Sequence, residues 1–219
     1  MTYHGHNRGM HDWGPFFAVH EHQQGAAPVA PWRPLRELVD QPGVLAERIA
    51  AIQAYLARGG GRPAWRVAAS VTHLGLVARL VSPTLGVAVR TGGFPALDLG
   101  EVWWQPELGG TFPLSAHYAP GGSAEALVDG PLRTLTEAFD VSEKVLWGNV
   151  ASAINGAATM LAGDRATALA GELLDTPLLR GASSRRADGR FQRRSCCLIY
   201  LAAASPDRNA VCGDCVLLP

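Results

Sequence analysis

The chain is poor in charge and contains almost no lysine. Only 17% of its 219 residues are charged, and 19 acidic and 19 basic side chains give a formal net charge of zero. Proteins that bind nucleic acid or an anionic membrane surface usually carry a basic excess, so the composition argues against both classes. Lys144 is the single lysine, and the arginines that make up the remaining basic residues indicate a compositional bias rather than a function.

Several other signals are missing. The sequence has no basic segment followed by an apolar one near its start, and its most apolar stretch, residues 67–89, is interrupted by His73, Arg79 and Pro83. We therefore expect a cytoplasmic protein, a monomer, with no integral membrane segment. A glycine-rich phosphate-binding motif is also absent, so we expect no bound nicotinamide, flavin or ATP.

The hydrophobic content of 47% is enough for a sizeable core. Apolar residues recur at helical spacing over five segments, and a turn signal lies between two β-favouring runs. The expected helices span 43–58, 63–81 (ending at Pro83, with a further short piece at 84–89), 123–139 (divided at Gly130 and Pro131), 142–161 and 164–174, with a hairpin at 101–118 and a strand at 197–201.

These elements predict an α+β fold: a mainly helical body with a small antiparallel sheet and a C-terminal cysteine-bearing strand and tail. The body is expected to span residues 35–190. A flexible N-terminal arm, residues 1–34, precedes it, and a metal-binding segment, residues 191–219, follows it. Residues 181–190 are expected to form a polar loop.

Cysteine is absent from the first 195 residues, and all four cysteines lie among the last 24. Cys196 and Cys197 are adjacent, and after fourteen residues Cys212 and Cys215 form a Cys-Gly-Asp-Cys motif. Such clustering is not explained by core packing and indicates a shared metal site or disulfides. Disulfides are rare in the cytoplasm, which favours a metal site.

Four thiolates suit a tetrahedral zinc ion, an iron–sulfur cluster or two disulfides. The Cys-Gly-Asp-Cys motif is typical of a turn that chelates one metal ion. The adjacent pair is unusual, because successive side chains of a strand point to opposite faces and the backbone must turn for both to reach one centre. Since structural zinc sites more commonly use two spaced pairs, a [2Fe–2S] cluster is the sharper prediction, and zinc and disulfides remain alternatives.

The end of the chain resembles the C-terminal motif of the FhuF-like ferric siderophore reductases. The resemblance rests on RRSCCLIY at 193–200 and CGDCVL at 212–217, and two stretches at 68–83 and 146–153 are also similar to the family. The spacer between the cysteine pairs is longer here than in the family, and Val216 stands where the family usually has proline.

The resemblance implies that Cys196, Cys197, Cys212 and Cys215 hold a [2Fe–2S] cluster. The protein would then be a cytoplasmic oxidoreductase that passes one electron to siderophore-bound Fe(III) and releases Fe(II). Its partners would be a ferric siderophore and an electron donor, either a ferredoxin-like protein or another reductant.

Three residues are candidates for substrate contacts. Arg194 adjoins the cysteines and belongs to an arginine-rich segment, 180–194, that could equally be a solvated surface. His73 lies among apolar residues, where a core histidine is the commoner outcome. Trp104 follows Trp103 on a predicted strand, so we expect one of the two tryptophans in the core and the other exposed.

Other function classes fit the sequence less well. The main alternative is a non-catalytic zinc-binding structural or interaction protein that uses the same four cysteines. An iron–sulfur sensor that binds DNA would need a helix-turn-helix with a basic face, which we do not find. A siderophore synthetase would need a phosphate-binding motif.

Overall fold

The computed structural model describes residues 9–203 and 211–218, and they form the predicted α+β fold. In chain order its helices and strands are η1 (Met10–Trp13), β1 (Arg33–Pro34), α1 (Glu37–Asp40), α2 (Pro42–Ala57), α3 (Trp65–Thr91), η2 (Leu99–Glu101), β2 (Val102–Trp104), β3 (Leu114–Ala116), α4 (Ala124–Leu127), η3 (Val128–Leu132), α5 (Arg133–Glu137), α6 (Glu143–Leu161), α7 (Asp164–Leu174), β4 (Ser183–Arg185), β5 (Phe191–Arg193) and η4 (Ile199–Ala202).

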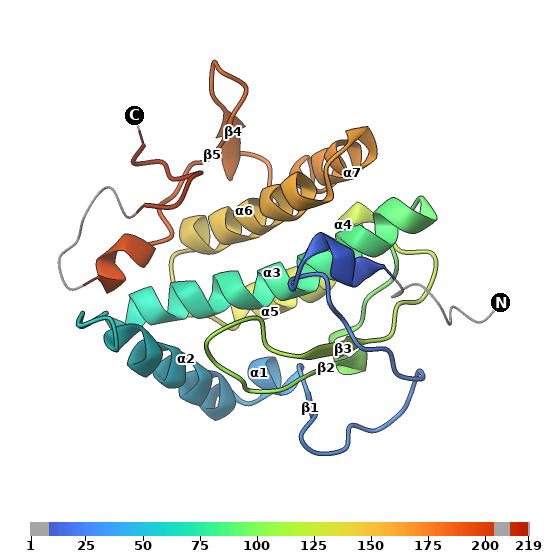
Figure 1. Cartoon of the computed structure of the whole chain (residues 1–219), viewed down its shortest axis with the longest axis horizontal. Coiled ribbons are helices and arrows are strands. Elements are labelled where there is room, and N and C mark those ends of the chain that lie inside the picture. The colour runs from blue at the N-terminus through green and yellow to red at the C-terminus, as the bar shows by residue number, and fades with distance from the viewer. Residues whose placement is uncertain (1–8, 204–210, 219) are drawn as a thin grey trace.

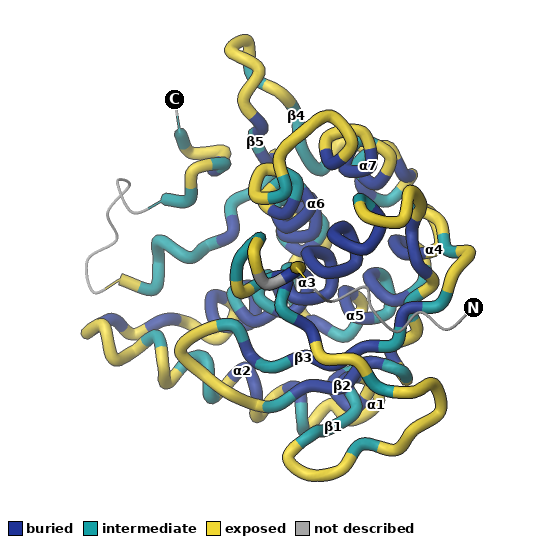
Figure 2. The backbone as a smooth tube through the Cα atoms, turned by 45° about the vertical axis from the view of Figure 1, so that its right-hand side comes forward, coloured by how far each residue is buried: buried dark blue, intermediate teal, exposed yellow. Residues whose placement is uncertain are grey.

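The longest helix, α3, runs through the middle of the molecule with α2 on one side and α6 on the other (Figure 1). Its residues 79–88 are all buried, and Figure 2 shows the helix inside a shell of exposed loops. Among the described residues it is the one helix long and apolar enough to cross a membrane, yet 78% of its most apolar window is buried inside the protein. A core helix passes the same test, and α3 is the core helix here.

Pro83 does not end this helix, contrary to the prediction. A proline inside a helix removes one backbone hydrogen bond and costs about 3 kcal/mol. Leu80 and Val81 before Pro83, and Leu85 after it, are apolar and buried, so a break there would expose them to water. Thr84 donates its hydroxyl to the carbonyl of Leu80 (2.7 Å) within the same turn. Packing therefore outweighs the local preference, and α3 ends only at Gly92, whose φ is +95°.

The predicted hairpin is confirmed, with Val102 opposite Ala116 and Trp104 opposite Leu114. The three-stranded antiparallel sheet has the order β1-β2-β3, and His20 exchanges backbone hydrogen bonds with Leu114 and Ala116 along the outer edge of β3. The expected division of the helix at 123–139 is also confirmed, because a π-turn, η3, separates α4 from α5.

The expectation that one of the two adjacent tryptophans is exposed is wrong. Trp104 is 1% exposed and donates its indole N–H to Oε1 of Glu37 (3.0 Å). Trp103, on the opposite face of β2, is 8% exposed and stacks on the ring of His22, with centroids 3.7 Å apart. The segment before β1 covers the second face of the sheet.

Residues 10–19, within the segment 1–34 that was predicted to be a flexible arm, pack against the core instead, whereas most of residues 20–31 are exposed. Met10 and Phe17 are fully buried in the core. Arg79 of α3 donates to the carbonyls of Phe16 (2.5 Å) and Ala18 (2.8 Å), which fixes an irregular backbone without helix or strand periodicity. Sequence periodicity could not reveal this packing.

The C-terminal segment also differs from the prediction. No strand is present at 197–201; Leu198 has a φ of +69°, and η4 follows it. The predicted polar loop instead contains β4, which pairs with β5 across the expected boundary at residue 190. The segment from residue 191 onward is thus continuous with the body.

The burial of individual side chains in the N-terminal segment predicts the effects of two matched alanine substitutions. Phe17→Ala should lower the free energy of unfolding by about 3–5 kcal/mol, because it leaves a cavity in the core. Val29→Ala in the same segment should leave it nearly unchanged, because Val29 is 74% exposed. Urea denaturation followed by circular dichroism measures both, and equal midpoints for the two variants would contradict the packing described here.

Candidate metal centre

Strand β5 brings the two halves of the cysteine motif together. The amide of Arg193 donates to the carbonyl of Asp214 (3.0 Å), and the side chain of Gln192 donates to the carbonyl of Cys215 (3.3 Å). Within the C-terminal turn, the amide of Cys215 donates to the carbonyl of Cys212 (3.0 Å). The second pair of cysteines is thereby held beside the first, although fourteen residues separate them.

The four thiols form two neighbouring pairs. The sulfurs of Cys197 and Cys212 lie 3.5 Å apart, and the thiol of Cys196 interacts with the thiols of Cys215 and Cys197. All four are free cysteines; Cys197 and Cys215 are buried and the other two are half-buried. Within the described chain, no group of three or more His, Cys, Asp or Glu side chains is arranged to hold a metal ion.

Backbone amides point at two of the sulfurs. The amide of Leu198 donates to Sγ of Cys196 (3.3 Å), and the amide of Leu217 donates to Sγ of Cys215 (3.4 Å). The left-handed backbone of Leu198 produces the turn that the adjacent cysteine pair requires. Such N–H donors stabilise negative charge on sulfur, as metal-bound thiolates need.

The thiols of Cys197 and Cys212 interact directly and shift each other's pKa. The contact with Cys212 lowers the pKa of Cys197 to about 6, with smaller contributions from the amide of Ile199 and the charge of Arg193. The same interaction, together with burial, raises the pKa of Cys212. Burial raises the pKa of Cys196. One thiolate is therefore favoured at Cys197 before any metal binds.

A buried polar network lies under Cys197. Ser70 of α3 donates its hydroxyl to the carbonyl of Cys197 (2.8 Å). Asn149 of α6 donates to the carbonyl of Ser70 (3.0 Å) and accepts from Nη2 of Arg193 (2.6 Å). The contact between α3 and α6 thus fixes the backbone at the first cysteine pair.

Arg193 is the unusual member of this network. Its side chain is fully buried, and no carboxylate among the described residues pairs with it. Its Nε and Nη1 have no hydrogen-bond partner, and neither has the buried hydroxyl of Ser195. A buried charge without a counter-ion is costly, so the site is arranged for an anion.

An anionic metal–thiolate group fits these residues. It would place negative charge beside Arg193, whose positive charge already acts on Cys197, and it would use all four thiols as ligands. A second link holds the other cysteine pair, because Ser152 of α6 donates its hydroxyl to the carboxylate of Asp214, between Cys212 and Cys215.

The structure places the predicted substrate residues away from solvent, with one exception. Arg194 is exposed, whereas its neighbour Arg193 is buried. His73 and Trp104 are 0% and 1% exposed, so a ligand could touch neither without opening the core. The two predictions for substrate contact at His73 and Trp104 are therefore corrected: both residues are part of the core.

Sequence reasoning missed the supporting residues Arg193, Ser70 and Ser152. Asn149 entered it only as part of the stretch 146–153 that is similar to the family. The available signal was a set of polar side chains on otherwise apolar helix faces, which is expensive unless they have buried partners. Arginine abundance masked the same signal for Arg193.

Comparison with models of known protein families and with curated proteins found no match for this chain. The resemblance to the FhuF-like reductases therefore stays a prediction, and it rests on the cysteine motif.

The contact between the C-terminal segment and α6 predicts different effects for substitutions at two glycines of α6. A Cβ at Gly148 would overlap the Ser195 hydroxyl and crowd Nη2 of Arg193, so Gly148→Ala should displace the cysteine segment and increase its cleavage in limited proteolysis. A Cβ at Gly156 meets nothing within 4 Å, so Gly156→Ala should stabilise the helix by about 1 kcal/mol and leave cleavage unchanged. Equal cleavage of the two variants would contradict this contact.

His73 predicts an acid-sensitive component of stability. Thr136 already donates its hydroxyl to Leu132, so Nε2 of His73 donates to Thr136 (3.2 Å), and Nδ1 accepts from Asn149 (3.4 Å). Burial, then Arg193, lowers the pKa of His73 from 6.5 to about 3. The unfolded chain binds this proton below pH 6.5 and the folded protein does not, so stability present above pH 6.5 is lost as the pH falls toward 3.

His73→Gln should remove this pH-dependent contribution to the unfolding free energy. Between pH 6 and pH 4 the unfolding free energy of the variant should fall less steeply than that of the wild type, by about 1.4 kcal/mol per pH unit. His20→Gln, which removes an exposed ring, is the matched control. Parallel pH profiles for the wild type and His73→Gln would show that His73 is protonated in the fold.

Proposed function

We propose that this protein is a cytoplasmic iron–sulfur oxidoreductase that reduces a ferric siderophore. Cys196, Cys197, Cys212 and Cys215 would hold a [2Fe–2S] cluster, and an electron donor such as a ferredoxin-like protein would supply the electron. One observation carries the proposal: four free thiols gather beside a buried arginine that has no anionic partner.

The arrangement of the thiols supports a cluster over the alternatives. A [2Fe–2S] cluster needs two pairs of thiolates, one pair for each iron, whereas structural zinc needs four ligands around one point. The thiols here form two neighbouring pairs, Cys197 with Cys212 and Cys196 with Cys215. A non-catalytic zinc protein is the second candidate, because its ligand set would be the same.

The chemistry required of the chain is limited. A bound [2Fe–2S] cluster supplies one electron at a time, which matches the reduction of Fe(III) to Fe(II). Hard oxygen ligands of a siderophore hold Fe(III) far more strongly than Fe(II), so reduction releases the metal. The residues of this chain would hold the thiolates, donate amide hydrogen bonds to sulfur and place Arg193 beside them. No proton-transfer group is needed.

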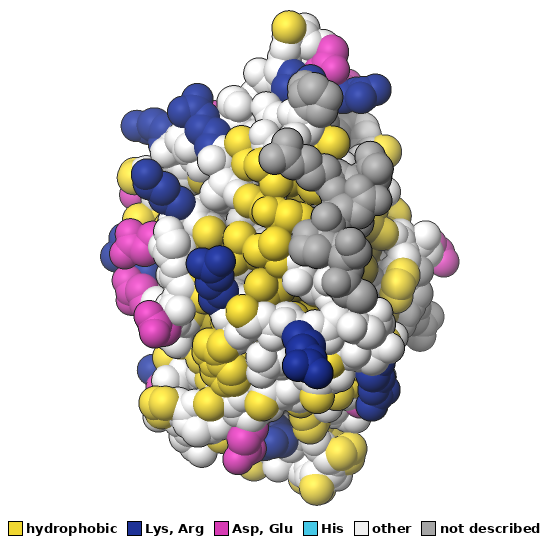
Figure 3. Space-filling view, turned by 90° about the vertical axis from the view of Figure 1, so that its left-hand side faces the viewer, with side chains coloured by type: hydrophobic (Ala, Val, Ile, Leu, Met, Phe, Trp, Pro, Cys, Tyr) yellow, Lys and Arg dark blue, Asp and Glu magenta, His cyan; other side chains and the backbone are white. Residues whose placement is uncertain are grey.

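The face that carries the C-terminal turn is suited to contact with other molecules. Val216 and Leu217 follow the last cysteine and are 39% and 41% exposed. Figure 3, which views the molecule from the side of η4 and the α2–α3 turn, shows hydrophobic side chains gathered along the middle of this face, with basic side chains around them and acidic ones along one edge. A siderophore or a donor protein could approach the cysteines here.

A single-turnover reaction tests the proposal. Protein purified without oxygen is reduced with dithionite, desalted, and mixed with a ferric trihydroxamate chelate and a colorimetric Fe(II) trap. We expect Fe(II) to form in proportion to the cluster content while the visible spectrum of the protein returns to its oxidised form. A colourless zinc-containing protein, or a reduced protein that leaves Fe(III) untouched, would contradict it.

Two adjacent arginines provide matched variants for the role of the buried charge. Arg193→Met should lower the reduction potential of the centre, because a nearby positive charge stabilises the more negative, reduced form. Arg193→Lys should preserve most of the potential, and Arg194→Met should leave it at the wild-type value because Arg194 is exposed. Redox titration followed by visible absorption measures all three; equal shifts for the two methionine variants would show that burial of Arg193 has no electrostatic consequence.

A further inference from the structure

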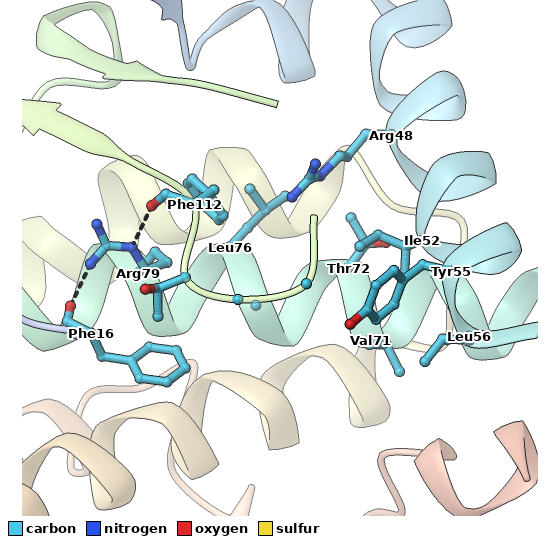
Figure 4. A pocket seen from close by; sticks show the side chains of 14 residues that line it. Phe16, Arg48, Ile52, Tyr55, Leu56, Val71, Thr72, Leu76, Arg79 and Phe112 are labelled. Atoms are coloured by element: carbon cyan, nitrogen blue, oxygen red, sulfur yellow. Dashed lines mark hydrogen bonds between the residues drawn. The ribbon is translucent and has the colours of Figure 1, made fainter. Parts of the chain in front are cut away.

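A cavity lies between α2, α3 and the loop that precedes β3, away from the cysteines. Its volume is about 210 Å³. Its walls are mainly apolar and aromatic, and they include Ile52, Leu56, Val71, Leu76 and Phe112 (Figure 4). The exposed Tyr55 and the Gly109–Gly110 turn flank its mouth. An apolar cavity of about 150 Å³ is known to hold benzene, so this one has room for a ring with a small substituent.

Two buried arginines give this apolar cavity a positive charge. Arg48 and Arg79 are 7% and 2% exposed, and their guanidinium groups lie 5.6 and 5.7 Å from the centre of the same ring, that of Phe112. Among the described residues, neither makes an ion pair with a carboxylate. Burial of these two cations at one cavity therefore costs folding free energy.

The two arginines have different roles. Arg79 donates to the carbonyls of Phe16, Ala18 and Phe112, so its donors are occupied by backbone (Figure 4). In the part of the chain that the structure describes, Arg48 donates through Nη1 to the carbonyl of Glu107 (2.9 Å), and its guanidinium lies 5.3 Å from the centre of the Trp104 ring. Figure 4 shows this guanidinium reaching toward the cavity. Arg48 is thus the cation able to bind a ligand, and Arg79 adds charge at the far end.

Gly75 leaves space on the floor of this cavity. It lines the cavity from α3, and a Cβ built there meets nothing within 4 Å. Glycine in a helix interior costs about 1 kcal/mol relative to alanine. The open space therefore exists at a cost in helix stability, as expected where a ligand approaches the helix.

We propose that this cavity binds a small aromatic carboxylate. The carboxylate would form a charge-assisted pair with Arg48, and the ring would lie on Gly75 among the apolar side chains. Tyr55 and the Gly109–Gly110 turn would cover it at the mouth. The site is separate from the cysteines: Val71, Thr72 and Gly75 face it, whereas Ser70 faces α6 and Cys197. The inference does not depend on a metal centre.

Isothermal titration with benzoate and benzamide, which share a ring and differ in charge, tests this inference on the full chain. We expect benzoate to bind and benzamide to bind at least tenfold more weakly. Arg48→Met should weaken benzoate binding about 10- to 100-fold, the range for loss of a charge-assisted hydrogen bond. Arg66→Met, at an exposed arginine of α3 outside the cavity, should leave benzoate binding unchanged.

A steric variant keeps the test decisive if Arg48→Met folds poorly. Gly75→Leu should fill the cavity without a backbone clash and abolish binding while the protein keeps or gains thermal stability. Absence of benzoate binding to the wild type at millimolar concentrations would overturn the proposal. Equal affinity for benzoate and benzamide, or unchanged binding in Gly75→Leu, would overturn it as well.

Discussion

The need to neutralise one buried positive charge organises the C-terminal part of this protein. Arg193 is enclosed between α6 and the cysteine segment, and no carboxylate of the described chain lies against it. Its side chain donates to Asn149 and to the carbonyl of Val145, and its positive charge helps to lower the pKa of Cys197. The same residue ties the two cysteine pairs together, since its amide holds Asp214. Arg193 therefore both carries the buried charge and holds the two cysteine pairs together.

The helix α3 separates two sites of different character. One face carries Ser70, whose hydroxyl holds the backbone of Cys197, and is packed against α6. The other face carries Val71 and Gly75 and lines an apolar cavity with buried arginines. Because α3 is buried along most of its length, neither face can move without disturbing the core. The proposed metal centre and the proposed carboxylate site therefore rest on the same rigid element.

Local sequence predicted the elements well wherever local energies decide them. Helical spacing located α2, α6 and α7, and the turn signal at Gly109–Gly110 located the β2–β3 hairpin. Prediction was wrong at Pro83, where burial on every side outweighs a lost hydrogen bond, and for residues 10–19, where hydrogen bonds from Arg79 support an irregular backbone. Both depend on contacts between distant residues, which periodicity does not contain.

The sequence likewise identifies one part of the candidate site and not the other. The four cysteines could be chosen from the sequence because their clustering is a property of the chain alone. Their supporting residues could not, because Ser70, Asn149 and Arg193 meet only when α3 packs on α6. The choice of Arg194 over Arg193 shows the limit: two adjacent arginines are equivalent in sequence, and burial alone distinguishes them.

Whether the four thiols bind an iron–sulfur cluster is measured by the visible absorption and low-temperature EPR of protein purified without oxygen, before and after dithionite, together with iron and acid-labile sulfide analysis. We expect a red-brown protein with equal amounts of iron and sulfide, whose colour bleaches as a spin-one-half signal appears. A colourless protein that holds stoichiometric zinc, or one in which the four thiols are paired as disulfides, would contradict it.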